Sequence, residues 1–375
     1  MGGGRRGGGK DYEADLSKHP IGTGPCALTE FVERERAVLA KTGDWWGGAF
    51  YLDRIEYIDT GDDTSAAVEA LISKQVDMVW RLPVEAVETV ERAEGLELAP
   101  VTTAQTAVMR FRVTEQPFDN KRLRQAVAAC MDHQAILDTA FQGNGVVAEN
   151  HHVCPIHPEY AILPRLRRDI ELSKRLLIQA GYPDGVDPAT GKALAIQLFD
   201  RAAAGRSPLY RYYIEQFAKV GLRPTIEEPD FPSPIGKMHS REAQMIHWGW
   251  GADYPDPENF LQLFYGPNAD GTYNESQYRN GEYDALYSKI AQMPPSPERD
   301  ALIRRMVERL AVDLPKVFLF HRVSHYFTQR WTASLQPNPL GYREMKYWDV
   351  DARGRAAATD EWNRTTLSGY LTVVG

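Results

Sequence analysis

A run of aromatic residues, glycines and carboxylates at positions 247–266 holds the residue types best suited to bind a small ligand. Trp248, Trp250 and Tyr254 offer broad apolar faces, and the glycines between them let the backbone approach another group closely. We interpret the run as an aromatic and glycine-rich turn with Asp253 as its central charge. A carboxylate among aromatic rings is costly unless it is paired, so Asp253 has either an internal basic partner or a cationic ligand. In the alternative interpretation, Asp253 only caps the segment that follows.

A second group of reactive side chains lies in the proline- and histidine-rich connection 146–164, which lacks clear periodicity and is expected to be a loop. It contains His151, His152, Cys154 and His157, whose imidazole and thiol groups suit zinc or nickel. Their spacing fits no standard zinc module, and no His-Glu-x-x-His helix accompanies them. A loop that faces a cleft or the solvent is the alternative to a metal site.

The motifs of common enzymes are missing from the sequence. There is no Gly-x-Ser-x-Gly elbow and no phosphate-binding Gly-x-x-x-x-Gly-Lys-Ser/Thr loop. Asp253 and Asp256 could be imagined as the carboxylate pair of a glycosidase, but only the aromatic residues suggest a sugar site. We expect Asp256 to cap a turn at 258–264 instead. The sequence therefore predicts a binding protein without a cofactor, not an enzyme.

Composition agrees with a globular protein that does not bind nucleic acid. The chain has 375 residues, of which 43% are apolar and 25% charged, and its formal net charge is -8. It has no basic excess, and no apolar run reaches the roughly 18 to 20 residues that cross a bilayer. Cys26, Cys130 and Cys154 are an odd set, which defines no disulfide framework. The glycine- and arginine-rich residues 1–18 lack the apolar core of a secretory signal and are expected to form a flexible leader.

Hydrophobic periodicity predicts alternating helices and strands that would position these residues. The expected helices cover residues 65–74, 84–93, 121–129, 133–141, 169–180, 208–220, 283–293 and 298–312. The expected strands cover residues 76–80, 96–101, 107–113, 194–199, 225–228 and 317–321. Thr64, Asp119 and Asp132 are the expected caps of three helices. Such alternation favours an open α/β sheet with helices on both faces, and in these folds ligands bind where the strand order switches or between lobes.

Several separate motifs, taken together, resemble one protein family. They are Pro-Ile-Gly-Thr-Gly-Pro at 20–25, Trp46 followed by Tyr-Leu-Asp-Arg-Ile at 51–55, Val-Asp-Met at 76–78, Pro-Phe-Asp-Asn-Lys-Arg-Leu-Arg-Gln-Ala at 117–126, Trp-Gly-Ala-Asp-Tyr-Pro-Asp-Pro at 250–257 and Asn-Gly-Glu-Tyr-Asp-Ala-Leu at 280–286. In this order and spacing the chain resembles the family 5 extracellular solute-binding proteins, the oligopeptide-, dipeptide- and nickel-binding receptors of bacterial ABC importers. The resemblance covers about residues 18 to 350.

The resemblance implies a two-lobed α/β fold of the periplasmic-binding-protein class II type, which closes by a hinge over a ligand between the lobes. By analogy, residues 19–106 form part of the first lobe, and residues 107–321 form the second lobe with hinge strands at both ends. Residues 322–375 then return to the first lobe and extend it. Family members carry a substantial segment before the Gly-Thr-Gly-Pro motif, so we expect the first lobe to be incomplete.

The resemblance also implies a role for the aromatic run. In peptide-binding members, the aspartate at the position of Asp253 receives the α-ammonium of the peptide, and Trp250 forms a packing wall. His247 matches the place of a basic residue near the ligand's carboxylate, with a buried histidine at a strand end as the alternative. The expected ligand-binding set is therefore Asp253, Trp250, His247, Trp248 and Tyr254.

The function that the resemblance implies is capture of a peptide or other amine-bearing solute in the periplasm and its delivery to the membrane subunits of an ABC permease. One alternative is a carrier of a metal or metal chelate, which would use the histidine-rich loop. A further alternative is a truncated product that folds but binds nothing.

Overall fold

The computed structural model describes residues 20–43, 45–61, 63–80, 82, 84–148, 153, 156–160, 167–199, 208–227, 243–270, 273–332, 337–341, 344–359 and 370–374. The chain forms two compact units. Unit 1 comprises Met1–Val101 and Ser324–Gly375, and unit 2 comprises Thr102–Val323. No helix among the described residues is long and apolar enough to cross a membrane.

The helices and strands alternate along most of the chain. The strands are β1 (Cys26–Val32), β2 (Arg36–Lys41), β3 (Arg54–Ile58), β4 (Met78–Trp80), β5 (Leu96–Phe111), β6 (Gly145–Val147), β7 (Val186–Asp187), β8 (Lys192–Ala193), β9 (Gln197–Phe199), β10 (Thr225–Glu227), β11 (Met245–Gly251), β12 (Lys316–Gln329) and β13 (Tyr370–Val374). The α-helices are α2 (Thr64–Ile72), α3 (Val84–Glu91), α4 (Lys121–Cys130), α5 (His133–Phe141), α6 (Ile170–Ala180), α7 (Pro208–Ala218), α9 (Glu258–Leu261), α10 (Gly281–Ile290), α11 (Pro297–Asp313) and α12 (Ala352–Ala358).

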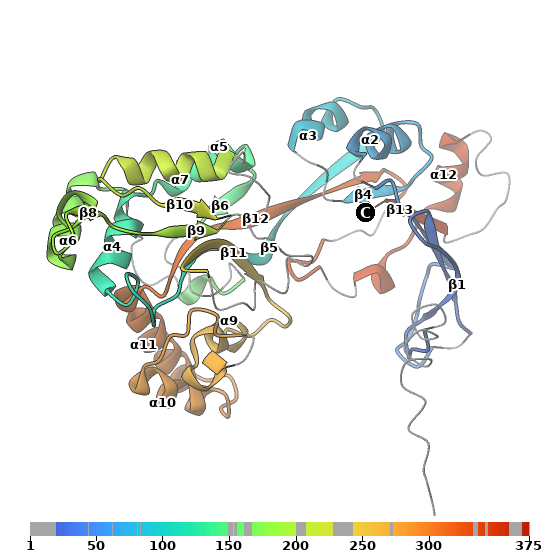
Figure 1. The fold of residues 1–375 in the computed structure, drawn as a ribbon. Helices are drawn as coiled ribbons and strands as arrows, with labels where there is room; N and C mark the ends of the chain where they lie inside the picture. Colours follow the sequence, from blue (N-terminus) through green and yellow to red (C-terminus); the bar gives the residue numbers. More distant parts are fainter. Residues whose placement is uncertain are drawn as a thin grey trace, which may run out of the picture. The chain divides into compact units, whose positions relative to one another are not determined.

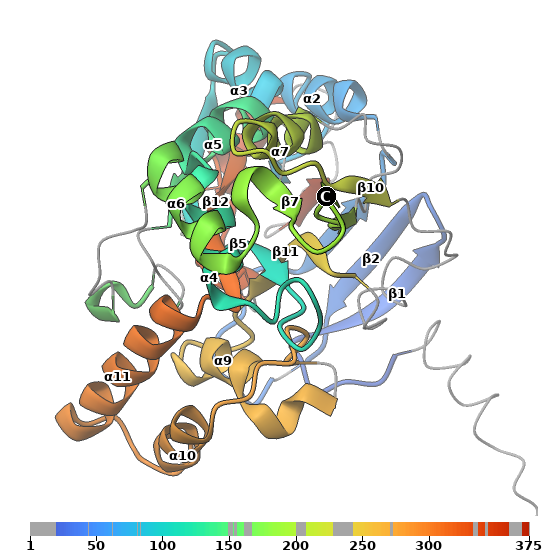
Figure 2. The ribbon, with the colours of Figure 1, turned by 60° about the vertical axis from the view of Figure 1, so that its left-hand side comes forward.

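Unit 2 is built on a mixed sheet in which the strands follow the order β12, β5, β11, β9, β10, with β6 paired to β12. β11 is antiparallel to β5, whereas β9 is parallel to both β11 and β10. Helices α5 and α7 lie over one face of this sheet, and α9, α10 and α11 lie on the other (Figure 1). Figure 2 shows α4 and α6 beside α5 and α7, in the same layer. The expected α/β sheet with helices on both faces is therefore present in this unit.

The two faces of the unit 2 sheet have separate apolar cores because successive side chains of a strand point to opposite faces. Met109 of β5 and Leu319 of β12 belong to the cluster that packs against α4 to α7. Their neighbours Val108 and Phe318 belong to the cluster that packs against α10 and α11. Side chains on alternate positions of β5 and β12 thus hold both helix layers.

Arg124 holds the start of α4 against the end of α11. Its guanidinium donates hydrogen bonds to the carbonyls of Phe118, Asp119, Asp313 and Leu314. Burial lowers the pKa of Arg124 to about 10, although Asp313 nearby opposes the shift. The cost of burying this cation is offset because its donors are met by carbonyl oxygens.

Unit 1 also has a sheet with a core on each face. Its order is β1, β2, β3, β13, β4, followed by the C-terminal part of β12. β13 is parallel to both of its neighbours, β3 and β4. Met78 and Tyr326 belong to one apolar cluster, and the adjacent Val79 and Phe327 belong to the other, which contains residues of α2 and α3. The last described strand of the chain therefore lies inside the sheet and not at its edge.

A buried ion pair attaches α12 to the unit 1 sheet. Asp77 is 1% exposed, and its carboxylate lies 3.0 Å from the guanidinium of Arg355, which is 3% exposed. The indole Nε1 of Trp331 donates to the other carboxylate oxygen at 2.7 Å. Both oxygens of this carboxylate are thus satisfied away from water, as a buried charge requires.

Two expected helix caps are wrong by one residue. The side chain of Asp63, not that of Thr64, caps α2, and the side chain of Asn120, not that of Asp119, caps α4. In both cases two adjacent residues have side chains that can cap, and sequence alone does not choose between them. Asp132 caps α5 as expected.

The expected break between strands 96–101 and 107–113 is also wrong, because β5 runs without interruption from Leu96 to Phe111. The polar residues 102–106 interrupt the apolar pattern, but threonine favours extended backbone. The Thr103 hydroxyl donates to the carbonyl of Arg322, and that of Thr106 bonds to His321 Nδ1 at 3.0 Å. The polar side chains are therefore satisfied within the strand. β5 and β12 contribute residues to both units.

We predict that Asp77→Ala lowers the free energy of unfolding of unit 1 by about 3 to 5 kcal/mol, because it leaves the Arg355 cation buried without its counterion. Urea unfolding followed by tryptophan fluorescence measures the change. The control is Glu88→Ala, which removes the exposed Arg92–Glu88 pair and should change stability by less than about 1 kcal/mol. Equal effects of the two substitutions would contradict this role of Asp77.

Candidate functional site

The aromatic run begins as a strand. Its residues 247–251 are part of β11 (Met245–Gly251), which pairs with β5 so that Trp250 is opposite Thr106. A Cβ on Gly249 would lie 3.1 Å from the carbonyl oxygen of Thr106, and one on Gly251 would lie 3.1 Å from the Gln105 side chain. The glycines therefore permit close strand pairing, and the expectation of a turn over this part was wrong. The chain bends over residues 253–256, after the strand.

The alternation of β11 places its two tryptophans and its histidine on opposite faces. Trp248 and Trp250 pack against the apolar cluster that contains α10 and α11. The His247 ring lies 6.1 Å from the ring of Phe141 and 6.2 Å from that of Phe320, in the other layer. Its Nδ1 is hydrogen-bonded to the hydroxyl of Tyr213 at 3.0 Å. The structure thus separates His247 from the rest of the expected ligand-binding set.

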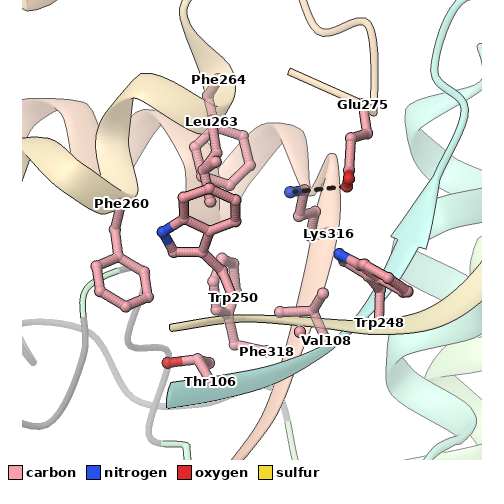
Figure 3. A pocket seen from close by; sticks show the side chains of 11 residues that line it. Thr106, Val108, Trp248, Trp250, Phe260, Leu263, Phe264, Glu275, Lys316 and Phe318 are labelled. Atoms are coloured by element: carbon pink, nitrogen blue, oxygen red, sulfur yellow. Dashed lines mark ion pairs between the residues drawn. The ribbon is translucent and has the colours of Figure 1, made fainter. Parts of the chain in front are cut away.

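Trp248 and Trp250 line a small cavity together with aromatic residues and a buried ion pair (Figure 3). The cavity measures about 10 Å³, which is roughly the space that one water molecule occupies. This volume is too small for a solute. A ligand of the motif is therefore not bound inside this cavity.

The ion pair in the cavity wall joins the buried Lys316 to Glu275, whose side chain is 7% exposed. Lys316 is 3% exposed, and its ammonium lies 3.9 Å from the Glu275 carboxylate and 5.2 Å from the centre of the Phe264 ring. Burial lowers the pKa of Lys316 from 10.5 to about 8, Glu275 opposes this shift, and the Arg110 cation adds to it. The Lys316 ammonium therefore loses its proton more easily in the folded protein than in the unfolded chain.

Asp253 lies just beyond the end of β11, and its side chain is exposed. Its carboxylate Oδ2 accepts a hydrogen bond from Asn259 Nδ2 at 3.4 Å, and its backbone N–H donates to Asn259 Oδ1 at 3.3 Å. Among the residues that the structure describes, Asp253 is in no ion pair. The first of the two expected states, an internal basic partner, is thus not seen in this part of the chain.

The other carboxylates of the motif are occupied. Asp256 pairs with Arg299 at 2.6 Å and accepts the backbone N–H of Glu258, the first residue of α9, at 2.8 Å. The N-cap position itself is Pro257, one residue after the expected Asp256. Glu258 accepts hydrogen bonds from the hydroxyls of Tyr254 and Tyr287. Burial and this contact with Glu258 raise the pKa of Tyr254 to about 12. The Tyr254 hydroxyl is therefore neutral, and Tyr254 directly follows Asp253 in the sequence.

Of the histidine-rich loop, only His157 can be placed, because His151, His152 and Cys154 lie outside the described residues. The Nδ1 atom of His157 lies 3.2 Å from the Glu159 carboxylate. Within the described ranges, no cluster of three or more histidine, cysteine, aspartate or glutamate side chains is arranged to hold a metal.

Comparison with known families identifies the chain. The family described as bacterial extracellular solute-binding proteins, family 5, matches residues 7–272. The chain belongs to this family. The match covers the Gly-Thr-Gly-Pro motif and the aromatic run, and it confirms the family that the motifs indicate.

Curated relatives of this solute-binding protein include carriers of different solutes. Heme-binding protein A of Haemophilus influenzae is 25% identical over 344 residues, which are 90% of this chain and 61% of the relative. Di/tripeptide-binding protein 3 of Pseudomonas aeruginosa is 25% identical over 311 residues, which are 82% of this chain and 57% of the relative. The chain thus spans about three-fifths of the length of these relatives.

Solved structures of similar proteins share the fold. The ABC transporter-associated periplasmic binding protein DppA from Helicobacter pylori, in complex with the peptide STSA, has a TM-score of 0.74 at 23% identity and covers 91% of this chain and 66% of its own. The oligopeptide-binding protein AppA from Bacillus subtilis, in complex with a nonapeptide, has a TM-score of 0.74 at 20% identity and covers 91% of this chain and 69% of its own. The solute-binding protein therefore has the two-lobed α/β fold class that its motifs predict.

Sequence reasoning missed three residues of this region, namely Asn259, Glu275 and Lys316. Asn259 could have been noticed as a polar residue directly before the apolar pair Phe260 and Leu261. Glu275 and Lys316 give no such signal, because charged residues at the start of a strand or in a loop are usually exposed.

We predict that the wild-type protein gains stability relative to Lys316→Met as the pH rises from about 7.5 to about 10. Because the folded pKa of Lys316 lies below the unfolded value, its burial penalty is complete below about pH 8 and disappears as the pH approaches 10.5. Urea unfolding of both proteins at the two pH values measures the difference. The substitution Lys174→Met, which removes a partly exposed lysine paired with Glu171, is the control for the loss of a lysine side chain. If the difference in the free energy of unfolding between wild type and Lys316→Met does not change with pH, the lowered pKa of Lys316 is contradicted.

Proposed function

We propose that this chain belongs to the substrate-binding component of an ABC importer and captures a peptide or other amine-bearing small solute. Delivery to the membrane permease and a periplasmic location are parts of the same proposal. The observation that carries it is the Asp253 carboxylate, which is exposed at the end of β11 and bonded only to Asn259 among the described residues. An ionised carboxylate in this setting is a suitable partner for a ligand ammonium group.

The neighbouring side chains suit such a ligand. The partly buried indole of Trp250 and the exposed ring of Tyr254 are close to Asp253 in the sequence and offer faces for apolar parts of a solute. Tyr273, which is 45% exposed, contacts Trp250 edge-on with ring centres 6.0 Å apart. A dissociation constant near micromolar needs only about -8 kcal/mol in total. One ammonium–carboxylate pair and a few apolar contacts are sufficient for that affinity.

The same contacts argue for binding and not for catalysis. A glycosidase requires two carboxylates that are free to act on the substrate. Asp256 is instead held by Arg299, and Glu258 is held by two tyrosine hydroxyls. Of these three carboxylates, that of Asp253 is the one left to bind a ligand. Peptide capture is also supported by the names of relatives, which include di/tripeptide-binding and oligopeptide-binding proteins.

A thermal-shift screen of the purified chain against di- to pentapeptides, including Ser-Thr-Ser-Ala, tests the proposal. We expect at least one peptide to raise the melting temperature, because a ligand that binds only the folded state stabilises it. Nickel and zinc salts in parallel wells test the metal-carrier alternative. A shift with metals alone would replace the peptide proposal, and no shift with any ligand would favour a chain that folds without binding.

We predict that Asp253→Asn weakens binding of an amine-bearing peptide by at least about 30-fold, because the ligand ammonium loses its charged partner. Isothermal titration calorimetry measures the affinity, and circular dichroism checks that the fold survives. Asp270→Asn is the matched control, since Asp270 is also an exposed aspartate of unit 2 but pairs with Arg279. Unchanged affinity in Asp253→Asn would rule out the assignment of this carboxylate to the ligand.

A further inference from the structure

Asn259, the second residue of α9, is a fully buried polar residue. Its Oδ1 accepts the indole N–H of Trp250 at 2.9 Å and the backbone N–H of Asp253 at 3.3 Å. Its Nδ2 donates to Asp253 Oδ2 at 3.4 Å. One amide group thus contacts both the aromatic wall and the carboxylate of the candidate site.

The orientation of this amide follows from its partners. An indole N–H and a backbone N–H only donate, so the oxygen of Asn259 must face Trp250 and the Asp253 backbone. An ionised carboxylate only accepts, so the nitrogen must face Asp253 Oδ2. A flipped amide would place donor against donor and acceptor against acceptor. No other uncharged side chain of this length offers both functions in one plane.

The two other carboxylates near Asn259 have partners of their own. Asp256 is paired with Arg299, and Glu258 is occupied by Tyr254 and Tyr287. Asp253 is the carboxylate of this motif that the amide reaches. Among the described residues, Oδ2 is the only oxygen of this carboxylate with a hydrogen bond, so the lone pairs of Oδ1 can accept from a donor of the ligand.

We propose that Asn259 is a positioning residue, which fixes the Trp250 indole and the Asp253 carboxylate as one unit so that Oδ1 of Asp253 meets the ammonium group of the ligand. This inference rests on the proposed function for the identity of the ligand group. Its structural part, the anchoring of Trp250 and Asp253 by one amide, can be tested without any ligand. An exposed aspartate without this anchor would lose side-chain conformational entropy when the ligand binds, and this loss would lower the affinity.

The test compares Asn259→Leu with Asn274→Leu as a matched control. Asn274 is also fully buried in unit 2 and makes three hydrogen bonds, but its partners are backbone groups of Tyr265 and Tyr278. Both variants lose a buried amide, whereas only the first loses contact with Asp253 and Trp250. If the leucine variant does not fold, Asn259→Ser removes the amide with a smaller change of shape.

The first readout is the indole N–H signal of Trp250 in ¹⁵N-labelled protein, assigned with Trp250→Phe. We expect the signal to move and its hydrogen exchange to accelerate in Asn259→Leu but not in Asn274→Leu, because only the former removes the acceptor. An unchanged indole signal in Asn259→Leu would overturn the anchoring role.

The second readout is the affinity for Ser-Thr-Ser-Ala and for its des-amino analogue. Asn259→Leu should lower the affinity for the amine-bearing peptide about tenfold relative to wild type, since one hydrogen bond to a charged group is lost. It should lower the affinity for the des-amino form much less. Equal losses for both forms, or an equal loss in Asn274→Leu, would show a merely structural role. If wild-type protein binds neither form, the same comparison is made with a peptide that the thermal-shift screen identifies. If the screen identifies none, the peptide proposal and the ligand-directed part of this inference both fail, whereas the indole signal still decides the anchor.

Discussion

The antiparallel pairing of β11 with β5 determines where the side chains of the candidate site in unit 2 point. Its register places Trp248 and Trp250 on one face and His247 on the other, and it ends the strand just before Asp253. A Cβ at Gly249 would lie 3.1 Å from the Thr106 carbonyl oxygen, so the paired strand would have to shift by a few tenths of an ångström. The glycines that suggested a turn are therefore compatible with a closely paired strand, which ends two residues before the exposed Asp253.

Beyond the strand end, the motif consists of charges that are mostly neutralised within the protein. Arg299 from α11 holds Asp256, and Tyr287 from α10 shares Glu258 with Tyr254. These contacts tie the short helix α9 to two longer helices of the same layer. Rigid elements position a binding group better than a free loop does. One carboxylate can thus remain exposed on a segment whose other charged groups have internal partners.

Local patterns of the sequence predicted the helices well, because their apolar spacing and caps are local properties. Asp132 and Asp169 stand at the starts of α5 and α6 as expected, and Gly181 stands at the end of α6. The strands were predicted less well. β1 and β2 were missed, and β5 was divided, since strand length depends on partners that are distant in sequence. The family motifs indicated Asp253 and Trp250, but the separation of His247 and the role of Asn259 required the three-dimensional register.

The position of β13 has a consequence for the order of folding. Unit 2 comes from the single stretch Thr102–Val323, whereas unit 1 needs residues from before and after that stretch. Because β13 lies between β3 and β4, the unit 1 sheet is complete only when a strand that follows all of unit 2 in the sequence has joined it. Domains generally fold as units. Unit 2 can therefore fold by itself, whereas β3 and β4 keep unpaired edges until β13 joins them.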